Sequence, residues 1–504
     1  MVAKMKKQKI KNIILSFSSQ LIILLLGFIV PRVILDNYNS DTNGLINTIT
    51  QIFTYVALLE AGIAQSTTNT LYKFVHKNDI EKENVSKILS TSHYSFKRAS
   101  IYYGIVIILL SFFLPLVLQT ELDYITICLY ILFEGTASLI SFYFVQKWNC
   151  LLQVDGKNYI IQLTELITKV LSYGSKIVLS LFGLNIVFIQ VVFFIISIGK
   201  VMIYKKYINK HYGWIEIKKE HKSEKLADRK AYIVSELAWT VFSSTDLIIL
   251  SIFCSTKFSS IYSIYNMVFL ALNSLLNSIF NSMKYMLGQS YFEDKENYHI
   301  KHDFFNSIFV GVMTLLLCVS YHLIIPFVKL YTSGITDVNY IYYSFPILFC
   351  LVQLLSWSRY VSGNLTAIAG YAKYTSYISV AEAIINLVLS IVLVNKYGIL
   401  GVLLATVVAL PLKVVITNWM SDVIIMKRNV WKTVRIIGIN YLIFFVTAFI
   451  SLFYKIEITS ISEFIGYGIL LSIIYFPIIF ILNYITNKNI LDIIKNIVRK
   501  KGTN

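Results

Sequence analysis

The chain has 504 residues, of which 56% are hydrophobic and 14% charged, and its formal net charge at pH 7 is +18. The mean hydropathy is +0.67. A water-soluble domain could not bury the apolar surface that this composition implies, so the composition excludes a soluble protein.

Continuous apolar stretches, each long enough to cross a bilayer, fill most of the chain. A hydrocarbon core of roughly 30 Å needs about 20 apolar residues in a helix. By that criterion the sequence predicts an all-α polytopic membrane protein with about fourteen transmembrane helices. The predicted spans are 13–35, 44–70, 98–118, 125–147, 159–182, 184–204, 231–253, 259–284, 304–328, 341–363, 374–394, 399–424, 433–453 and 463–485. The first is long enough for a true transmembrane helix, so no cleavable signal is expected.

Lys and Arg fall mostly on one side of these spans. An even number of spans places both termini on the same side, which also receives the basic loops 72–98 and 205–230. The loops of the opposite side hold only Lys257, Lys329, Lys396 and Lys455. The positive-inside rule therefore predicts that both termini are cytoplasmic. The same rule accounts for the net charge, so anionic membrane lipids are expected as partners and nucleic acid is not.

The order of the spans predicts an internal repeat. Spans beginning near 13, 44 and 125 recur at an offset of about 215 residues, as do Glu165 and Gly183 with Glu382 and Gly398. We expect two six-helix lobes related by a pseudo-two-fold axis along the membrane normal, with a cavity between them. The expected parts are an N-terminal lobe at 1–204, a basic cytoplasmic linker at 205–230, a C-terminal lobe at 231–424, and two helices with a basic cytoplasmic tail at 425–504.

One predicted span, 159–182, carries a polar stripe along its whole length. Polar residues recur every three or four positions and so share one helix face: Asn158, Gln162, Glu165, Lys169, Ser172, Lys176 and Ser180. A charge at the bilayer centre costs at least roughly 2.5–3.5 kcal/mol, so the stripe indicates a hydrated cavity. The alternative is that Glu165 and Lys169 neutralise each other and that Lys176 extends to the membrane surface.

Three other spans carry shorter polar stripes, which include Glu382 in 374–394, Asn47 and Gln51 in 44–70, and Asn273 and Asn277 in 259–284. Amide side chains both donate and accept hydrogen bonds, which suits a ligand rich in hydroxyl groups. The alternative is that they bond neighbouring helices.

The remaining embedded charges are candidates for anion binding or for ion coupling. The embedded cations are Arg32, Lys169, Lys176, Lys200, Arg359 and Lys413, of which Lys200 is expected to extend to the membrane surface. The embedded acids are Glu60, Glu134, Glu165, Glu236, Asp246 and Glu382, and they either counter these cations or take up Na⁺ or H⁺. No other cofactor is expected. Neither a metal-binding cysteine pattern nor a phosphate-binding loop occurs, and no catalytic set can be inferred.

Short motifs in this order resemble the bacterial polysaccharide transporters of the O-antigen flippase type. The motifs are Pro31-Arg32, Asn43-Gly44-Leu45, Leu59-Glu60-Ala61-Gly62-Ile63, Leu71-Tyr72-Lys73, Leu151-Leu152-Gln153, Lys157-Asn158-Tyr159, Thr245-Asp246-Leu247-Ile248-Ile249, Gly370-Tyr371-Ala372-Lys373 and Gly398-Ile399-Leu400-Gly401-Val402. The resemblance runs to about residue 410, and Val154-Asp155-Gly156 departs from the pattern.

The resemblance implies membership of the multidrug/oligosaccharidyl-lipid/polysaccharide (MOP) exporter superfamily, two six-helix lobes and alternating access. It implies an undecaprenyl-diphosphate-linked oligosaccharide as substrate, flipped from the inner to the outer leaflet of a bacterial cytoplasmic membrane for capsule or O-antigen synthesis. Polysaccharide polymerase and glycosyltransferases are the implied protein partners. Only Arg32, Glu60 and Asp246 match by motif position.

Three alternatives stay open: a lipid II flippase, a cation-coupled drug exporter of the same superfamily, and a membrane glycan polymerase or ligase. The predicted external loops are short, whereas membrane glycan enzymes usually place their sites on large ones. A transporter without enzymatic activity is therefore expected.

Overall fold

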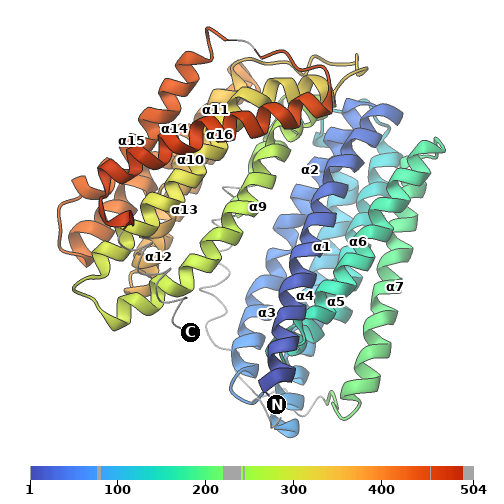
Figure 1. Ribbon diagram of the computed structural model, residues 1–504. Helices are drawn as coiled ribbons and strands as arrows, with labels where there is room; N and C mark the ends of the chain where they lie inside the picture. The colour runs from blue at the N-terminus through green and yellow to red at the C-terminus, as the bar shows by residue number, and fades with distance from the viewer. Residues whose placement is uncertain (1, 76–80, 219–239, 242–243, 455, 492–504) are drawn as a thin grey trace. The chain divides into compact units, whose positions relative to one another are not determined.

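The computed structural model describes residues 2–75, 81–218, 240–241, 244–454 and 456–491, with the backbone alone at 2–17, 59–61 and 285 (Figure 1). The described residues form helices joined by short turns, and no β-strand occurs among them. The chain divides into two compact units, Met1–Ser260 and Ile261–Asn504. Each unit is described by itself.

The first unit is built from α1 to α7 and a short helix, Ser244–Phe253. The bounds are α1 Val2–Asn37, α2 Ser40–Val56, α3 Leu58–Leu71, α4 Lys82–Val117, α5 Tyr124–Val154, α6 Asn158–Leu181 and α7 Ile186–Tyr212. Helix α1 packs against α6, while α5 packs against α3, α4 and α7. A cluster of buried apolar side chains on α2 to α5, including Phe53, Phe96 and Tyr130, fills the space between these helices.

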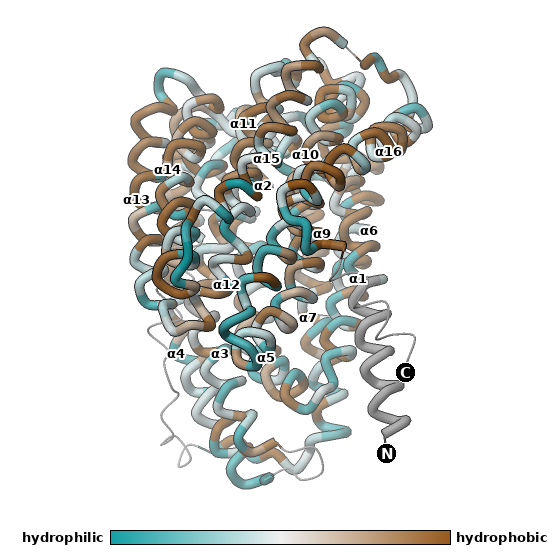
Figure 2. Tube along the Cα trace, turned by 60° about the vertical axis from the view of Figure 1, so that its left-hand side comes forward, coloured by the Kyte–Doolittle hydropathy of each residue, from teal (hydrophilic) through white to brown (hydrophobic). Residues whose placement is uncertain are grey.

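The second unit contains most of α9 and the helices that follow it. The bounds are α9 Thr256–Glu293, α10 Tyr298–Tyr331, α11 Phe345–Trp357, α12 Tyr360–Ile368, α13 Ala372–Tyr397, α14 Ile399–Trp419, the π-helix η2 Met420–Ile425, α15 Trp431–Ile450 and α16 Ile461–Thr486. Helices α13 and α14 pack along each other, and α10 packs against α11, α15 and α16. Figure 2 shows hydrophobic residues along much of α13, α14 and α16, as expected for surfaces that face lipid.

The all-helical membrane fold is confirmed. Eleven described helices are long and apolar enough to cross a membrane, and a shorter apolar helix spans Ser244–Phe253. Two predicted spans are each divided: 44–70 into α2 and α3 at Ala57, and 341–363 into α11 and α12 at Ser358 and Arg359. Span 159–182 forms α6. Positions 231–239 and 242–243 of the predicted span 231–253 lie outside the described residues, so the count of fourteen stays a prediction, as do the predicted lobe boundaries.

The predicted basic loop 72–98 is wrong from residue 82 onward. Helix α4 begins at Lys82 and has 36 residues, so at about 1.5 Å per residue it is longer than the hydrocarbon core is thick. The charged sequence reads as a loop because it is polar, but it continues the apolar helix that follows. Likewise α7 extends to Tyr212, into the predicted linker 205–230, and positions 219–230 lie outside the described residues.

The start of α9 is fixed to α2 in the first unit. Asp41, which is 1% exposed, accepts hydrogen bonds from the hydroxyls of Thr256 and Thr120 and from the backbone N–H of Glu121. A Cβ atom at Gly44 would lie 1.7 Å from the carbonyl oxygen of Thr256. Only glycine therefore permits this approach of α2 to α9.

Each unit contains a tight hairpin of long helices whose turn contains a glycine of positive φ. Gly183 (φ +67°) joins α6 to α7, and Gly398 (φ 54°) joins α13 to α14. At Gly401, a Cβ would lie 2.4 Å from the carbonyl oxygen of Leu393, so α13 and α14 are in close backbone contact near the turn. Such turns fix the relative register of the two helices that they join.

The last two helices, α15 and α16, are joined to each other by a pair of buried amides. Asn440 and Asn483 exchange two hydrogen bonds of 2.9 and 3.1 Å, and Asn487 donates to the Ser307 hydroxyl on α10 at 3.2 Å. Interhelical amide bonds of this kind stabilise helix pairs where water is absent. The hairpin is thus held against α10.

Candidate functional site

The α13–α14 hairpin brings Glu382 and Lys413 together. Glu382 lies 16 residues before Gly398 and Lys413 lies 15 residues after it, so both are about 22–24 Å from the turn. The Lys413 Nζ is 3.6 Å from Glu382 Oε2. The side chain of Glu382 is 2% exposed and that of Lys413 is 19% exposed, so the acid is the more deeply buried partner.

A second cation binds the other oxygen of the same carboxylate. Arg359, at the start of α12, donates from Nη1 to Glu382 Oε1 at 2.5 Å, and its side chain is 6% exposed. Three of the residues that the sequence nominated therefore form one cluster within the second unit. Two formal positive charges face one negative charge, and the cluster carries a net charge of +1.

The α6–α7 hairpin repeats this arrangement in the first unit. Glu165 lies 18 residues before Gly183 and Lys200 lies 17 residues after it. Lys200 Nζ is 2.6 Å from Glu165 Oε1, and the two side chains are 11% and 35% exposed. Lys200 was not expected to pair with Glu165, and the alternative pairing of Glu165 with Lys169 is wrong. The turn, not the i+4 spacing, selects the partner.

Lys169 and Lys176, on the same stripe of α6, form no ion pair with any carboxylate of a described residue. Lys169 is exposed, with Nζ 5.4 Å from the ring centre of Tyr173. Lys176 is half-buried, with Nζ 5.3 Å from the ring centre of Phe193. Aromatic faces stabilise a cation weakly, by about 0.5–1 kcal/mol at exposed sites. Both charges remain available to an anion.

The other predicted residues of the first unit do not join these lysines in one cluster. Arg32 pairs with Asp36 at 3.0 Å, one turn along α1. Asn47 donates to the carbonyl oxygen of Asn43 at 2.8 Å, and Gln51 is half-buried on the same helix. Asp246 is buried on the helix Ser244–Phe253. The side chain of Glu60 lies outside the described residues, as does all of Glu236.

In the second unit, Asn273 and Asn277 on α9 have different surroundings. Asn273 accepts a 2.5 Å hydrogen bond from Trp357 Nε1, so it bonds a neighbouring helix. Asn277 is exposed. The amide stripe of α9 thus contains one interhelical contact and one side chain open to its surroundings.

Sequence reasoning missed a buried lysine on α5. Lys147 is 5% exposed, and its Nζ lies 3.0 Å from His93 Nδ1 on α4, beside the rings of Tyr143 and Trp148. The predicted span ended at residue 147, whereas α5 continues to Val154. Placing Lys147 inside the helix would have added it to the embedded cations. Glu134 accepts a hydrogen bond from Gln190.

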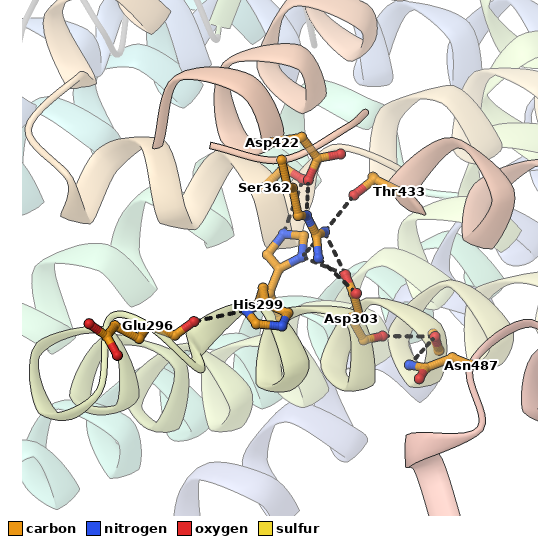
Figure 3. A network of polar contacts seen from close by, with 10 residues as sticks. Glu296, His299, Asp303, Ser362, Asp422, Thr433 and Asn487 are labelled. Atoms are coloured by element: carbon orange, nitrogen blue, oxygen red, sulfur yellow. Dashed lines mark hydrogen bonds and ion pairs between the residues drawn. The ribbon is translucent and has the colours of Figure 1, made fainter. Parts of the chain in front are cut away.

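An Arg-centred network in the second unit was also missed (Figure 3). Arg428 binds both oxygens of Asp303 on α10 at 2.8 and 2.6 Å, and Asp422 in η2 at 2.8 Å. It also donates to Thr433 on α15 at 3.1 Å. Burial lowers the pKa of Arg428, but the hydrogen bonds and charge of Asp303, followed by Asp422, outweigh it and raise the pKa above its ordinary value. The network joins α10, η2 and α15.

No protein-family model and no curated protein matches the chain. Solved structures do match its fold. An inward closed conformation of the lipid II flippase MurJ superposes with a TM-score of 0.70 at 15% identity, over 94% of this chain and 99% of that one.

Two other transporters match over less of the chain. An inward-facing MATE family transporter of the MOP superfamily gives a TM-score of 0.59 at 13% identity, over 81% of this chain and 97% of its own. A MOP superfamily transporter from Pyrococcus furiosus, described by the reverse polarity of its binding pocket, gives 0.58 at 12%, over 84% and 97%. At these identities the likeness shows the fold alone. The chain has the fold of MurJ and MATE transporters, and these neighbours are transporters, not enzymes.

Proposed function

We propose that the protein flips undecaprenyl-diphosphate-linked oligosaccharide repeat units from the inner to the outer leaflet of a bacterial cytoplasmic membrane, by alternating access. The product would supply capsule or O-antigen synthesis, with glycosyltransferases acting before it and a polysaccharide polymerase after it. Both termini would be cytoplasmic. The fold supports the transport part of this proposal, since one solved structure of the fold is a lipid II flippase.

The observation that carries the choice of substrate is the pair Lys169 and Lys176 on α6. The other four embedded cations that the sequence predicted each have a carboxylate partner: Arg32 has Asp36, Lys200 has Glu165, and Arg359 and Lys413 share Glu382. Lys147 is buried against His93. Lys169 and Lys176 lie seven residues apart, two turns on one face, and both lack a carboxylate partner among the described side chains. An anion is the ligand that such a pair favours.

A diphosphate group fits this pair in charge. Lysine binds phosphate as a point charge and tolerates movement of the ligand, which suits a substrate that must also be released. The half-buried amide of Gln51, on α2 of the same unit, would offer hydrogen bonds to the sugar. With an inside-negative potential, outward movement of an anion gains roughly 2.3 kcal/mol per charge per 100 mV.

Drug export is the second candidate, because MATE multidrug transporters share the fold. The polarity of α6 argues against cationic drugs, since Lys169 and Lys176 would repel them. The Pyrococcus furiosus transporter is described as having a binding pocket of reverse polarity that suggests a different function, so the fold is not restricted to multidrug export. Transport assays with two drugs of the same shape, one charged and one neutral, would distinguish drug export from lipid flipping.

Reconstitution into liposomes tests the proposal. A fluorescent lipid-linked oligosaccharide is placed in both leaflets, and its inner-leaflet fraction should become accessible to an impermeant reagent added outside only when the protein is present. The recovered lipid should be chemically unchanged. Longer glycan products would instead indicate a polymerase, and uptake of drugs without movement of the lipid would indicate a drug exporter.

A further inference from the structure

The two hairpins contain the same Glu–Gly–Lys arrangement at equivalent positions. Glu165, Gly183 and Lys200 precede Glu382, Gly398 and Lys413 by 217, 215 and 213 residues. In each unit the acid is on the first helix of the hairpin, and the lysine is on the second at nearly the same distance from the turn. The ion pairs are therefore a repeated feature of the fold and not two unrelated contacts.

An embedded carboxylate needs a counter-charge, and there are three ways to supply it. It can take up a proton, bind a metal cation from solution, or pair with a cation of the same chain. A transporter that uses either of the first two couples its movement to an ion gradient. The third leaves nothing to be exchanged with solution.

In both hairpins the carboxylate pairs with a cation of the same chain. Glu165 is held by Lys200 at 2.6 Å. Glu382 is held on Oε1 by Arg359 at 2.5 Å and faces Lys413 on Oε2 at 3.6 Å. Each oxygen of the buried Glu382 carboxylate thus already has a cation beside it, and the cluster has a surplus of positive charge.

We infer that Lys200, Arg359 and Lys413 are built-in counter-ions, so that transport by this protein requires no Na⁺ or other metal cation bound at either hairpin acid. The inference rests on the proposed function in so far as it concerns transport. The driving force would then come from the substrate's own charge in the membrane potential and from its removal on the outer side.

The residues around Glu382 include oxygen atoms that could bind a metal cation if Arg359 and Lys413 were absent. Asn386 lies one turn along α13 from Glu382, and its Nδ2 donates to the Thr406 hydroxyl on α14 at 2.8 Å. The Oδ1 of Asn386 is buried without a hydrogen-bond partner among the described residues. Carboxylate, amide and hydroxyl oxygens are the ligands that hard cations prefer. Without Arg359 and Lys413, the contact between α13 and α14 would present such oxygen ligands around an unpaired Glu382 carboxylate.

The test compares thermal unfolding of the purified full-length protein in sodium chloride and in N-methyl-D-glucamine chloride at equal ionic strength. Wild type should unfold at the same temperature in both. The variant Arg359→Gln/Lys413→Gln leaves Glu382 without a paired cation. Its unfolding temperature should be higher in sodium than in N-methyl-D-glucamine by about 2 °C or more, since a ligand that binds only the folded state stabilises it. The triple variant that also carries Glu382→Gln should lose that rise.

If the unit 2 variant does not fold, the same comparison is made with Lys200→Gln and its control Lys200→Gln/Glu165→Gln in the first unit. A rise in the unfolding temperature of wild type with sodium would overturn the inference, as would an absence of any sodium effect in the bare-acid variants. Because unfolding does not depend on translocation, these outcomes are independent of whether the protein flips lipid. Lipid flipping by wild type at equal rates in sodium and N-methyl-D-glucamine would complete the evidence.

Discussion

Glu165 and Lys200 lie 2.6 Å apart on the two helices of one hairpin, in the same relation to Gly183 that Glu382 and Lys413 have to Gly398. The first pair is half-open to its surroundings, since the side chain of Glu165 is 35% exposed. The second acid is buried at 2% and shares its carboxylate with Arg359. We therefore expect the two ion pairs to contribute differently to the free energy of unfolding.

Glu382→Gln should destabilise the protein by about 3–5 kcal/mol, because it leaves Arg359 and Lys413 buried without their carboxylate. Glu165→Gln is the matched variant in the other hairpin. It should cost at most about 1 kcal/mol, since its partially exposed charges are screened by solvent. Denaturant or thermal unfolding in detergent measures both. Equal losses for the two variants would show that burial does not set the strength of these pairs.

Gly44→Ala should destabilise the first unit by about 3 kcal/mol or more, because the new Cβ would collide with the carbonyl oxygen of Thr256 and overpack the α2–α9 contact. Gly174→Ala on α6 is the control, since a Cβ there meets nothing within 4 Å. That change should be neutral or stabilise by up to about 1 kcal/mol, because alanine favours a helix. The measurement is the unfolding temperature, and a mild effect of Gly44→Ala would refute the close approach.

Arg428→Gln should destabilise the second unit by about 3–5 kcal/mol, because Asp303 and Asp422 would be left without a cation in a largely buried site. Arg428→Lys should recover only part of the loss, since lysine cannot form the two-pronged contact with Asp303. Arg435→Gln on α15 is an exposed control that should change little. Monodispersity on size-exclusion chromatography and the unfolding temperature are the readouts; wild-type behaviour of Arg428→Gln would contradict the role of the network.

Asn440→Leu and Asn483→Leu should each weaken the contact between α15 and α16. A hydrogen bond between membrane helices contributes about 0.6 kcal/mol on average and up to about 1.7 kcal/mol, so the single losses should be modest. The double variant should cost less than the sum of the two, because the amides bond each other. A double-mutant cycle in unfolding experiments measures this coupling, and strict additivity would contradict the reciprocal pair.

Much of the fold follows from the sequence because apolar runs of bilayer length are a strong and local signal. The repeated landmarks Glu165, Gly183, Glu382 and Gly398 also predicted which helices carry the two acids that form these ion pairs. The alternative that paired Glu165 with Lys169 was wrong: it considered the nearest lysine along the helix, whereas the partner is Lys200 on the next helix. Glu165 and Lys200 lie at nearly equal distances from the turn glycine, which would have identified them as partners. That argument requires knowing that the hairpin is tight.

Other parts of the candidate site had no sequence signal. Arg428 meets Asp303 across 125 residues, and only tertiary packing brings them together. The division of span 44–70 at Ala57 is equally unmarked, since neither proline nor glycine stands there. Lys147 was lost through an error of a few residues at the end of a predicted span, where polar residues continue an apolar helix.

The most direct test of the account measures lipid flipping in liposomes by Lys169→Gln/Lys176→Gln. Lys396→Gln, an exposed lysine beside Tyr397 at the end of α13, is the control. The account predicts that the double variant inserts and purifies like wild type, that it has lost most of its flipping activity, and that the control retains it. Wild-type flipping by Lys169→Gln/Lys176→Gln would contradict the claim that these two cations bind the diphosphate of the substrate.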